Sequence, residues 1–141
     1  MANRGVYVEH LRRVQLFAGL STKELERIAA AGSEIDVKAG TVLVTQGHVG
    51  HDAFIVLSGS FVVRRNGLEV AQLAAGEFVG ELALLDDQPR SATVECTADG
   101  SVFVIGPRNF RAVFDDLPAL THKLLAALAG RIRDLDRGFL G

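Results

Sequence analysis

One acidic residue and one arginine, nine positions apart, are the residues of this chain best suited to bind a ligand together. Glu81 follows Gly80 and precedes a short apolar run that begins with Leu82 and Ala83, and Arg90 comes nine positions later. A glycine before a single helical turn lets several backbone N–H groups converge on an anion, and an arginine adds a planar fork that fits a phosphate. A carboxylate only accepts hydrogen bonds, so Glu81 would bind a hydroxyl group beside that phosphate. A phosphate next to a hydroxyl group is the chemistry of a nucleotide.

Taken singly, the same residues have simpler interpretations. Arg90 could be a surface arginine that forms an ion pair with Asp86 or Asp87. Glu81 could be an acid that favours the start of a helix through the helix dipole. Ser91 could be a small residue beneath a packed strand. The ligand interpretation therefore depends on the residues acting together.

The overall composition is that of one soluble globular domain. The chain has 141 residues, of which 48% are hydrophobic and 23% charged, and this length can bury a sizeable core. Its net charge is −2, whereas broad binding to nucleic acids needs a concentrated basic face. The N-terminal sequence has no secretory signal, and no apolar run approaches the ~18 residues of a membrane span. We therefore expect a cytoplasmic protein that binds neither nucleic acids nor membranes.

The cysteine and histidine pattern favours neither a metal site nor a catalytic centre. Cys96 is the one cysteine, so an internal disulfide is impossible, and its apolar strand pattern predicts a buried thiol. Metal-binding cupin enzymes have two histidines two positions apart, a glutamate shortly after them and a third histidine in a later strand. Here His48 and His51 are three apart and the next histidine is His122, so solvated loop histidines are expected. No nucleophile pattern can be assembled, so we expect no enzymatic activity.

Helical structure is predicted for residues 1–32. Ser21 and Glu24 have the spacing of a capping box, and Leu20 and Leu25 are placed to form a hydrophobic staple across it. Gly32 is the expected C-terminal stop of that helix.

Two more helices are predicted after the strands. A short one begins near Pro107, and a long one runs from about residue 118 to 137. The apolar seam of the long helix consists of Leu124, Leu125, Leu128, Ile132 and Leu135. This helix is longer than a small domain needs, so it could cover a ligand, pair with a second copy of the chain, or do both.

Between the helices, from residue 33 to 106, the sequence changes to short strands closed by turns. Ser58-Gly59 is expected to end one strand, and Asn66-Gly67 predicts a two-residue type I′ hairpin. The predicted strands cover 35–37, 42–44, 54–57, 61–65, 68–73, 91–96 and 102–105. This spacing indicates an antiparallel sandwich or barrel of about eight strands.

The stretch from Gly76 to Val94, GEFVGELALLDDQPRSATV, resembles the phosphate-binding cassette of cyclic nucleotide-binding domains. These domains occur in the catabolite activator protein and in the regulatory subunits of cyclic-AMP-dependent kinases. The upstream run AGTVLVTQGHVGHDAFIVLSGSFVV fits the glycine-punctuated roll of the same family. The resemblance covers nearly the whole chain and implies an α+β fold in a single domain, 1–141. An antiparallel β-roll or jelly-roll (a double-stranded β-helix) would be flanked by N-terminal helices and by a short and a long C-terminal helix.

The resemblance also implies a set of ligand-binding residues: Gly80, Glu81, Leu82, Ala83, Arg90, Ser91 and Ala92. Glu81 would accept a hydrogen bond from the ribose 2′-hydroxyl, Arg90 would pair with the cyclic phosphate, and Ser91 would add a hydroxyl group. The last helix would cover the base, and its candidate residues are Leu128, Arg131, Ile132 and Leu135.

The implied function is a stand-alone cyclic nucleotide sensor, with cyclic AMP preferred to cyclic GMP and no metal or cofactor. Ligand binding would reposition the 118–137 helix, through which a homodimer could form, and would signal to an unidentified protein partner. Three alternatives stay open: a degenerate fold that acts as a protein-interaction module without ligand, a metal-dependent cupin-type enzyme, and a nucleic-acid regulator. The last is disfavoured because the chain has no C-terminal helix-turn-helix domain.

Overall fold

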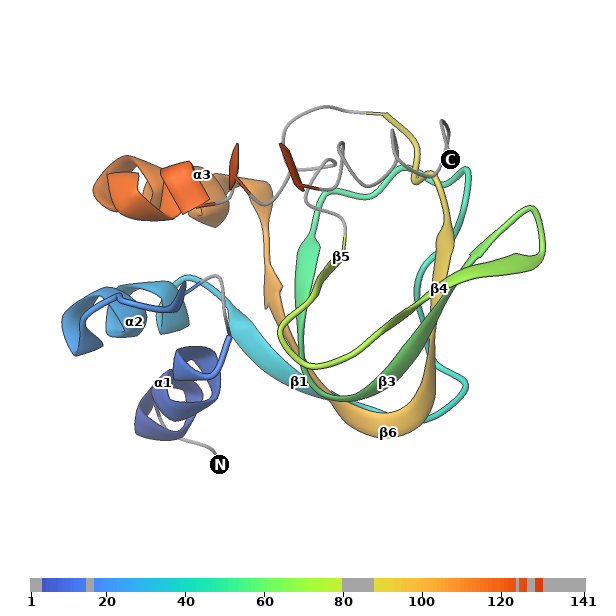
Figure 1. Cartoon of the computed structure of the whole chain (residues 1–141), viewed down its shortest axis with the longest axis horizontal. Coiled ribbons are helices and arrows are strands. Elements are labelled where there is room, and N and C mark those ends of the chain that lie inside the picture. Colours follow the sequence, from blue (N-terminus) through green and yellow to red (C-terminus); the bar gives the residue numbers. More distant parts are fainter. Residues whose placement is uncertain (1–3, 15–16, 80–87, 124, 127–128, 131–141) are drawn as a thin grey trace.

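The structure, a computed structural model, describes residues 4–14, 17–79, 88–123, 125–126 and 129–130. In this part of the chain, helices gather on one side of a strongly curled antiparallel sheet (Figure 1). The elements are α1 (Arg4–Arg12), α2 (Thr22–Ala29), β1 (Ser33–Val37), β2 (Val42–Val44), β3 (Ala53–Arg65), β4 (Leu68–Leu73), β5 (Phe78–Val79), β6 (Thr93–Ile105) and α3 (Pro107–Asp116). Helical backbone also occurs at 118–123, 125–126 and 129–130. The predicted α+β class, with helices before and after an antiparallel roll, is confirmed.

Two long strands, β3 and β6, form the spine of the sheet. The strand order is β1-β6-β3-β4, while β2 also pairs with β6 and β5 with β3, and every pairing is antiparallel. The sequence predicted that each 13-residue strand would be two shorter ones, and this was wrong. The structure describes six strands, fewer than the eight expected, partly because these pairs of short strands are continuous.

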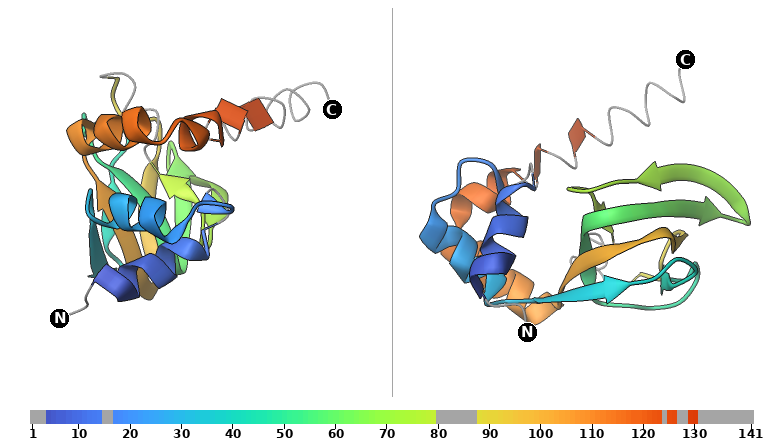
Figure 2. Two further views of the ribbon diagram at one scale, coloured as in Figure 1. Left: turned by 90° about the vertical axis from the view of Figure 1, so that its left-hand side faces the viewer. Right: turned by 90° about the horizontal axis from the view of Figure 1, so that it is seen from below.

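Glycines bend the spine where the sequence predicted breaks. A side chain on Gly59 would place its Cβ 2.6 Å from the Ala98 carbonyl oxygen, and one on Gly100 would place it 2.1 Å from the Ser58 carbonyl oxygen. The register between β3 and β6 shifts three times between Val56 and Phe61, as it does at β-bulges. The strands can therefore approach closely and curl without ending, which produces the rolled sheet seen in Figure 2.

The hairpin between β3 and β4 forms as predicted. Asn66 has a φ of 54° and Gly67 a φ of 80°, the positive values that a type I′ turn requires. The side-chain amide of Gln46 donates to Asn66 Oδ1 at 2.9 Å, and Gln46 Oε1 accepts from the Asn66 backbone N–H at 2.8 Å. These two hydrogen bonds hold the hairpin against the segment that follows β2.

The start of α2 was predicted correctly and its end was not. Ser21 is the N-cap and forms a reciprocal capping box with Glu24. The helix ends at Ala29, three residues before Gly32. Gly32 is required for a different reason, because a Cβ there would lie 2.4 Å from the Val104 carbonyl oxygen. It is a site of close contact with β6 and not a helix cap.

The buried apolar residues form two clusters. One lies between the helices and one end of the sheet and includes Leu11, Ile28 and Phe103. The other fills the roll and includes Phe61 and Cys96. An ion pair between Arg27 Nε and Asp116 Oδ2, at 2.9 Å, connects α2 with α3. The helices therefore pack together on one end of the roll.

Candidate anion-binding site

Three of the predicted ligand-binding residues, Arg90, Ser91 and Ala92, lie in the described part of the chain. The others lie outside the described residues, as do all four candidates for covering the base: Gly80, Glu81, Leu82, Ala83, Leu128, Arg131, Ile132 and Leu135. Their roles remain predictions. Asp86 and Asp87, the alternative ion-pair partners of Arg90, also lie outside this part.

Backbone hydrogen bonds hold Arg90 against the loop between β2 and β3. The Arg90 N–H donates to the His48 carbonyl at 2.9 Å, and the Gly47 N–H donates to the Arg90 carbonyl at 2.8 Å. A third bond runs from the Gln46 N–H to Thr93 Oγ1 at 2.9 Å. Two segments more than 40 positions apart therefore form one rigid unit around the arginine.

The Arg90 side chain is buried, so the interpretation of this residue as a surface arginine was wrong. Only 9% of the residue is exposed. Its Nη2 donates to the backbone carbonyl of Asp52 at 2.7 Å. Its Nη1 is buried and has no hydrogen-bond partner among the described residues. Buried polar groups are nearly always paired, so an unpaired one needs an explanation, and a binding role is one.

The electrostatics of the site favour an anion. Burial lowers the pKa of Arg90, and the negative charge of Asp52 acts in the opposite direction. A guanidinium stays protonated in proteins because its ordinary pKa lies far above neutral pH. A buried cation with an unpaired N–H group is costly in free energy until an oxyanion supplies both charge and acceptor. The arrangement can therefore bind a phosphate or a similar anion.

The two residues after Arg90 differ in exposure. Ser91 is exposed, and its carbonyl accepts a hydrogen bond from Arg65 Nε at 3.3 Å. Ala92 is buried, with 8% of the residue exposed. The sequence reasoning did not find Arg65 or the 46–52 loop as neighbours of the site. The only sequence signal in that loop is its turn composition, because most of its contacts with Arg90 are made by backbone atoms.

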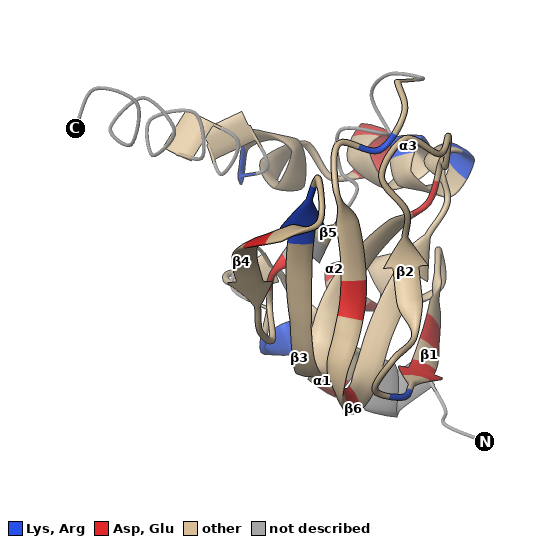
Figure 3. Ribbon diagram, turned by 90° about the vertical axis from the view of Figure 1, so that its right-hand side faces the viewer, with Lys and Arg blue, Asp and Glu red and all other residues tan. Residues whose placement is uncertain are grey.

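The remaining charged residues do not form a second site in the described part of the chain. Arg64 is paired with Glu95 at 3.0 Å, and the Lys and Arg residues seen in Figure 3 are scattered over several elements. No group of three or more His, Cys, Asp or Glu residues that could hold a metal occurs within the described ranges. None of the helices in those ranges is long and apolar enough to cross a membrane.

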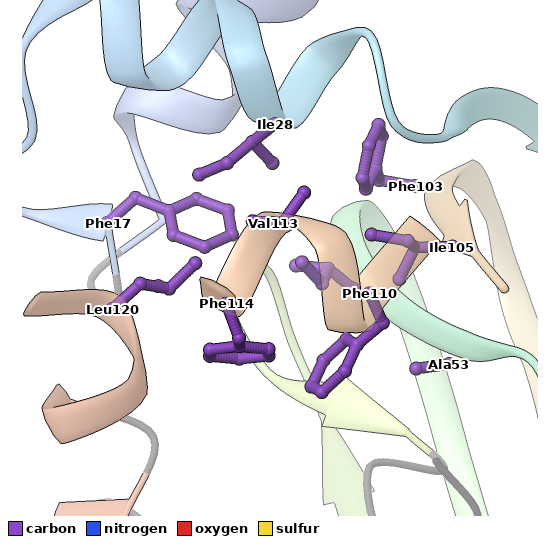
Figure 4. A pocket seen from close by; sticks show the side chains of 10 residues that line it. Phe17, Ile28, Ala53, Phe103, Ile105, Phe110, Val113, Phe114 and Leu120 are labelled. Carbon is purple, nitrogen blue, oxygen red and sulfur yellow. The ribbon is translucent and has the colours of Figure 1, made fainter. Parts of the chain in front are cut away.

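A small apolar cavity of about 30 Å³ lies between the helices and the sheet (Figure 4). Its lining includes Phe17, Ile28 and Ile105, together with Phe110 and Val113 of α3. Its exposed lining is entirely apolar. Arg90, Ser91 and Ala92, the predicted ligand-binding residues that the structure describes, do not line this cavity, and the described lining residues offer a phosphate no polar side chain.

Comparisons with known proteins agree on one family. The model of the family "Cyclic nucleotide-binding domain" matches residues 34–116. The Pycsar effector protein XpPycTIR of Xanthomonas perforans is 32% identical over 110 residues. The crystal structure of the Thermus thermophilus catabolite activator protein is similar, with a TM-score of 0.81 and 30% identity over 88% of this chain. The regulatory domain of Toxoplasma gondii PKA, solved with cAMP, has a TM-score of 0.76 and 28% identity over 91% of this chain.

These proteins extend beyond the region that they share with this chain. The match to the Xanthomonas effector spans 77% of this chain but 36% of the effector. The corresponding shares are 61% of the Thermus chain and 50% of the Toxoplasma chain. The similarity therefore concerns only part of each of these proteins.

Proposed function

The chain belongs to the cyclic nucleotide-binding domain family, and on this basis we propose that it is a ligand sensor that binds a cyclic nucleotide at Arg90, with cyclic AMP preferred to cyclic GMP. One observation carries the proposal. Arg90 is buried, and its Nη1 has no hydrogen-bond partner in the described part of the chain. A cyclic phosphate has one negative charge and two free oxygens, so it can neutralise one guanidinium and pair with its remaining N–H groups.

The other contacts of the ligand follow from the cassette sequence. Glu81 is proposed to accept a hydrogen bond from the ribose hydroxyl, and the backbone near Leu82 and Ala83 to complete the anion site. The hydroxyl group of Ser91, an exposed residue, can reach a ligand from solvent. One of the similar structures, the regulatory domain of Toxoplasma gondii PKA, was solved with cAMP and supports the choice of this nucleotide.

Signalling is proposed to run through the helix that begins at Pro118. A ligand that contacts both Arg90 and this helix would favour one position of the helix over another, and differential contact is what shifts such an equilibrium. The helix could also pair with a second copy of the chain or with a downstream protein. Solution spectra of residues 118–137 should change at saturating ligand, and unchanged spectra would remove the switching proposal without touching the binding proposal.

Calorimetric titration with cyclic AMP and cyclic GMP, side by side, tests the binding proposal. At ~0.3 kcal/mol for each of roughly 22 heavy atoms, binding should contribute ~6–7 kcal/mol, a dissociation constant on the order of 10 μM or lower. Arg90→Ala should weaken binding by roughly 10- to 150-fold, since a charge-assisted contact contributes ~1.5–3 kcal/mol.

Arg64→Ala is the matched control. Arg64 is half exposed and is already paired with Glu95 at 3.0 Å, so its removal should leave the affinity unchanged. Binding that survives Arg90→Ala would overturn the proposed site. A wild-type chain that binds neither nucleotide would instead point to the protein-interaction module that the sequence left open.

A further inference from the structure

Gly50, in the loop between β2 and β3, lies directly against the Arg90 guanidinium. A Cβ atom on Gly50 would come within 2.9 Å of Nη2, 3.0 Å of Nε and 3.3 Å of Cζ. Carbon and nitrogen atoms that are not bonded normally stay about 3.5 Å apart or more. Gly50 is not one of the glycines with a positive φ. The position therefore needs a glycine for space and not for its backbone conformation.

The same loop fixes the rest of the arginine. Its backbone pairs with Arg90 through Gly47 and His48, at 2.8 and 2.9 Å. Arg90 Nη2 donates a hydrogen bond to the backbone carbonyl of Asp52 at 2.7 Å. Nη2 is paired, and Nη1 is the buried nitrogen left without a partner in the described part of the chain. The loop thus decides which edge of the guanidinium is presented to a ligand.

From this geometry we infer that Gly50 is a positioning residue for the ligand-binding arginine. It does not contact the ligand in this scheme but acts through Arg90, and the inference rests on the function proposed above. A methyl group at Gly50 meets the far end of a flexible side chain and not backbone. The guanidinium can therefore move aside while the fold stays intact. Once it moves, the bond to the Asp52 carbonyl and the orientation of Nη1 are both lost.

The expected effect of Gly50→Ala is a loss of cyclic AMP affinity of about tenfold or more, because charge-assisted hydrogen bonds depend steeply on distance and angle. A double-mutant cycle separates this indirect role from a general structural one. The affinities of the wild type, Gly50→Ala, Arg90→Ala and the double variant are measured by titration with cyclic AMP, followed by NMR where binding is weak. In the Arg90→Ala background, Gly50→Ala should change the affinity by less than about twofold.

Two results of this cycle would overturn the inference. One is a Gly50→Ala variant that binds as tightly as the wild type. The other is an equal loss in both backgrounds, which would mean that Gly50 acts without Arg90. Gly106→Ala is the matched control, because its added Cβ would lie 3.5 Å from Asp52 Oδ1, an ordinary contact distance. It should leave the affinity unchanged.

A second measurement needs no ligand and so stays informative if the proposed function fails. The ¹⁵N resonance of Arg90 Nε reports the position of the guanidinium, and Gly50→Ala should shift it in the ligand-free protein. An unchanged resonance would contradict the inference. If Gly50→Ala lowers the unfolding temperature, adding Arg90→Ala should restore it, because this exchange removes the atoms that the new methyl group meets. Failure to restore it would count against the same inference.

Discussion

Replacing Arg90 with methionine should make the ligand-free protein more stable and at the same time weaken ligand binding by roughly 10- to 150-fold. A site that is built for an anion keeps a buried cation when the anion is absent. Arg90 is 9% exposed, and its Nη1 has no partner in the described part of the chain. Methionine has a similar unbranched stem without the charge or the N–H groups. The substitution therefore removes the free-energy cost of burying an unpaired charged group.

The size of the effect follows from two opposing terms. An unpaired buried donor costs ~1–3 kcal/mol, and the substitution removes that cost. Against this, the Asp52 carbonyl loses the 2.7 Å hydrogen bond from Nη2, which is worth ~0.5–1.5 kcal/mol. The net gain should be about 1 kcal/mol. In a chain of 141 residues this raises the unfolding temperature by about 3–5 °C.

Scanning calorimetry without ligand measures the change in unfolding temperature, and titration with cyclic AMP measures the loss of affinity. Arg64→Met is the control, because Arg64 is half exposed and paired with Glu95, so its loss should not raise the unfolding temperature. A lower unfolding temperature for Arg90→Met would refute the reasoning. It would show that the guanidinium stabilises the fold even without a ligand.

Two further predictions concern the roll itself. Burial raises the pKa of the Cys96 thiol, so the folded chain keeps this proton to a higher pH than the unfolded chain, whose thiol ionises near pH ~8.5. This contribution to the free energy of unfolding is fully present below that pH, and it is lost as the pH rises from there toward the higher pKa of the folded chain. Urea unfolding from pH 7 to 10 should show the wild type losing up to ~1.4 kcal/mol per pH unit relative to Cys96→Ala, and parallel profiles would contradict this. By the same method, Gly100→Ala should lower the free energy of unfolding by about 3 kcal/mol or more, because its Cβ would lie 2.1 Å from the Ser58 carbonyl oxygen. Gly130→Ala is the control and should be tolerated, because its Cβ would meet no described residue within 4 Å.

The sequence was most informative where a short pattern of neighbouring residues specifies one local conformation. The capping box of Ser21 and Glu24 and the type I′ turn of Asn66 and Gly67 form as predicted, because each involves neighbouring residues only. The alternation of helical and strand periodicity, together with the cassette, was enough to predict the α+β roll. Signals of this kind need no knowledge of distant contacts.

The predictions from sequence were wrong where a glycine allows close contact with a residue far away in the sequence. Ser58-Gly59 was predicted to end a strand, yet β3 continues through it, since Gly59 makes room for the backbone of β6. Gly32 was predicted as a helix stop, yet it makes room for Val104. A glycine that permits close approach and a glycine that forms a turn are the same letter in a sequence. Only the partner distinguishes them.

The site divides in the same way. The residue types and spacing of the cassette, with an acid, an arginine and small residues around a glycine, predicted a site for a nucleotide, because charge and hydrogen-bonding capacity belong to the side chains themselves. Only the tertiary structure showed that Arg90 is buried and that its Nη2 donates a hydrogen bond to the Asp52 carbonyl. It also showed that Gly50 lies next to the Arg90 guanidinium. These contacts join the arginine to a loop some 40 positions earlier, largely through backbone atoms. Because backbone atoms are the same in every residue, no sequence pattern could predict these contacts.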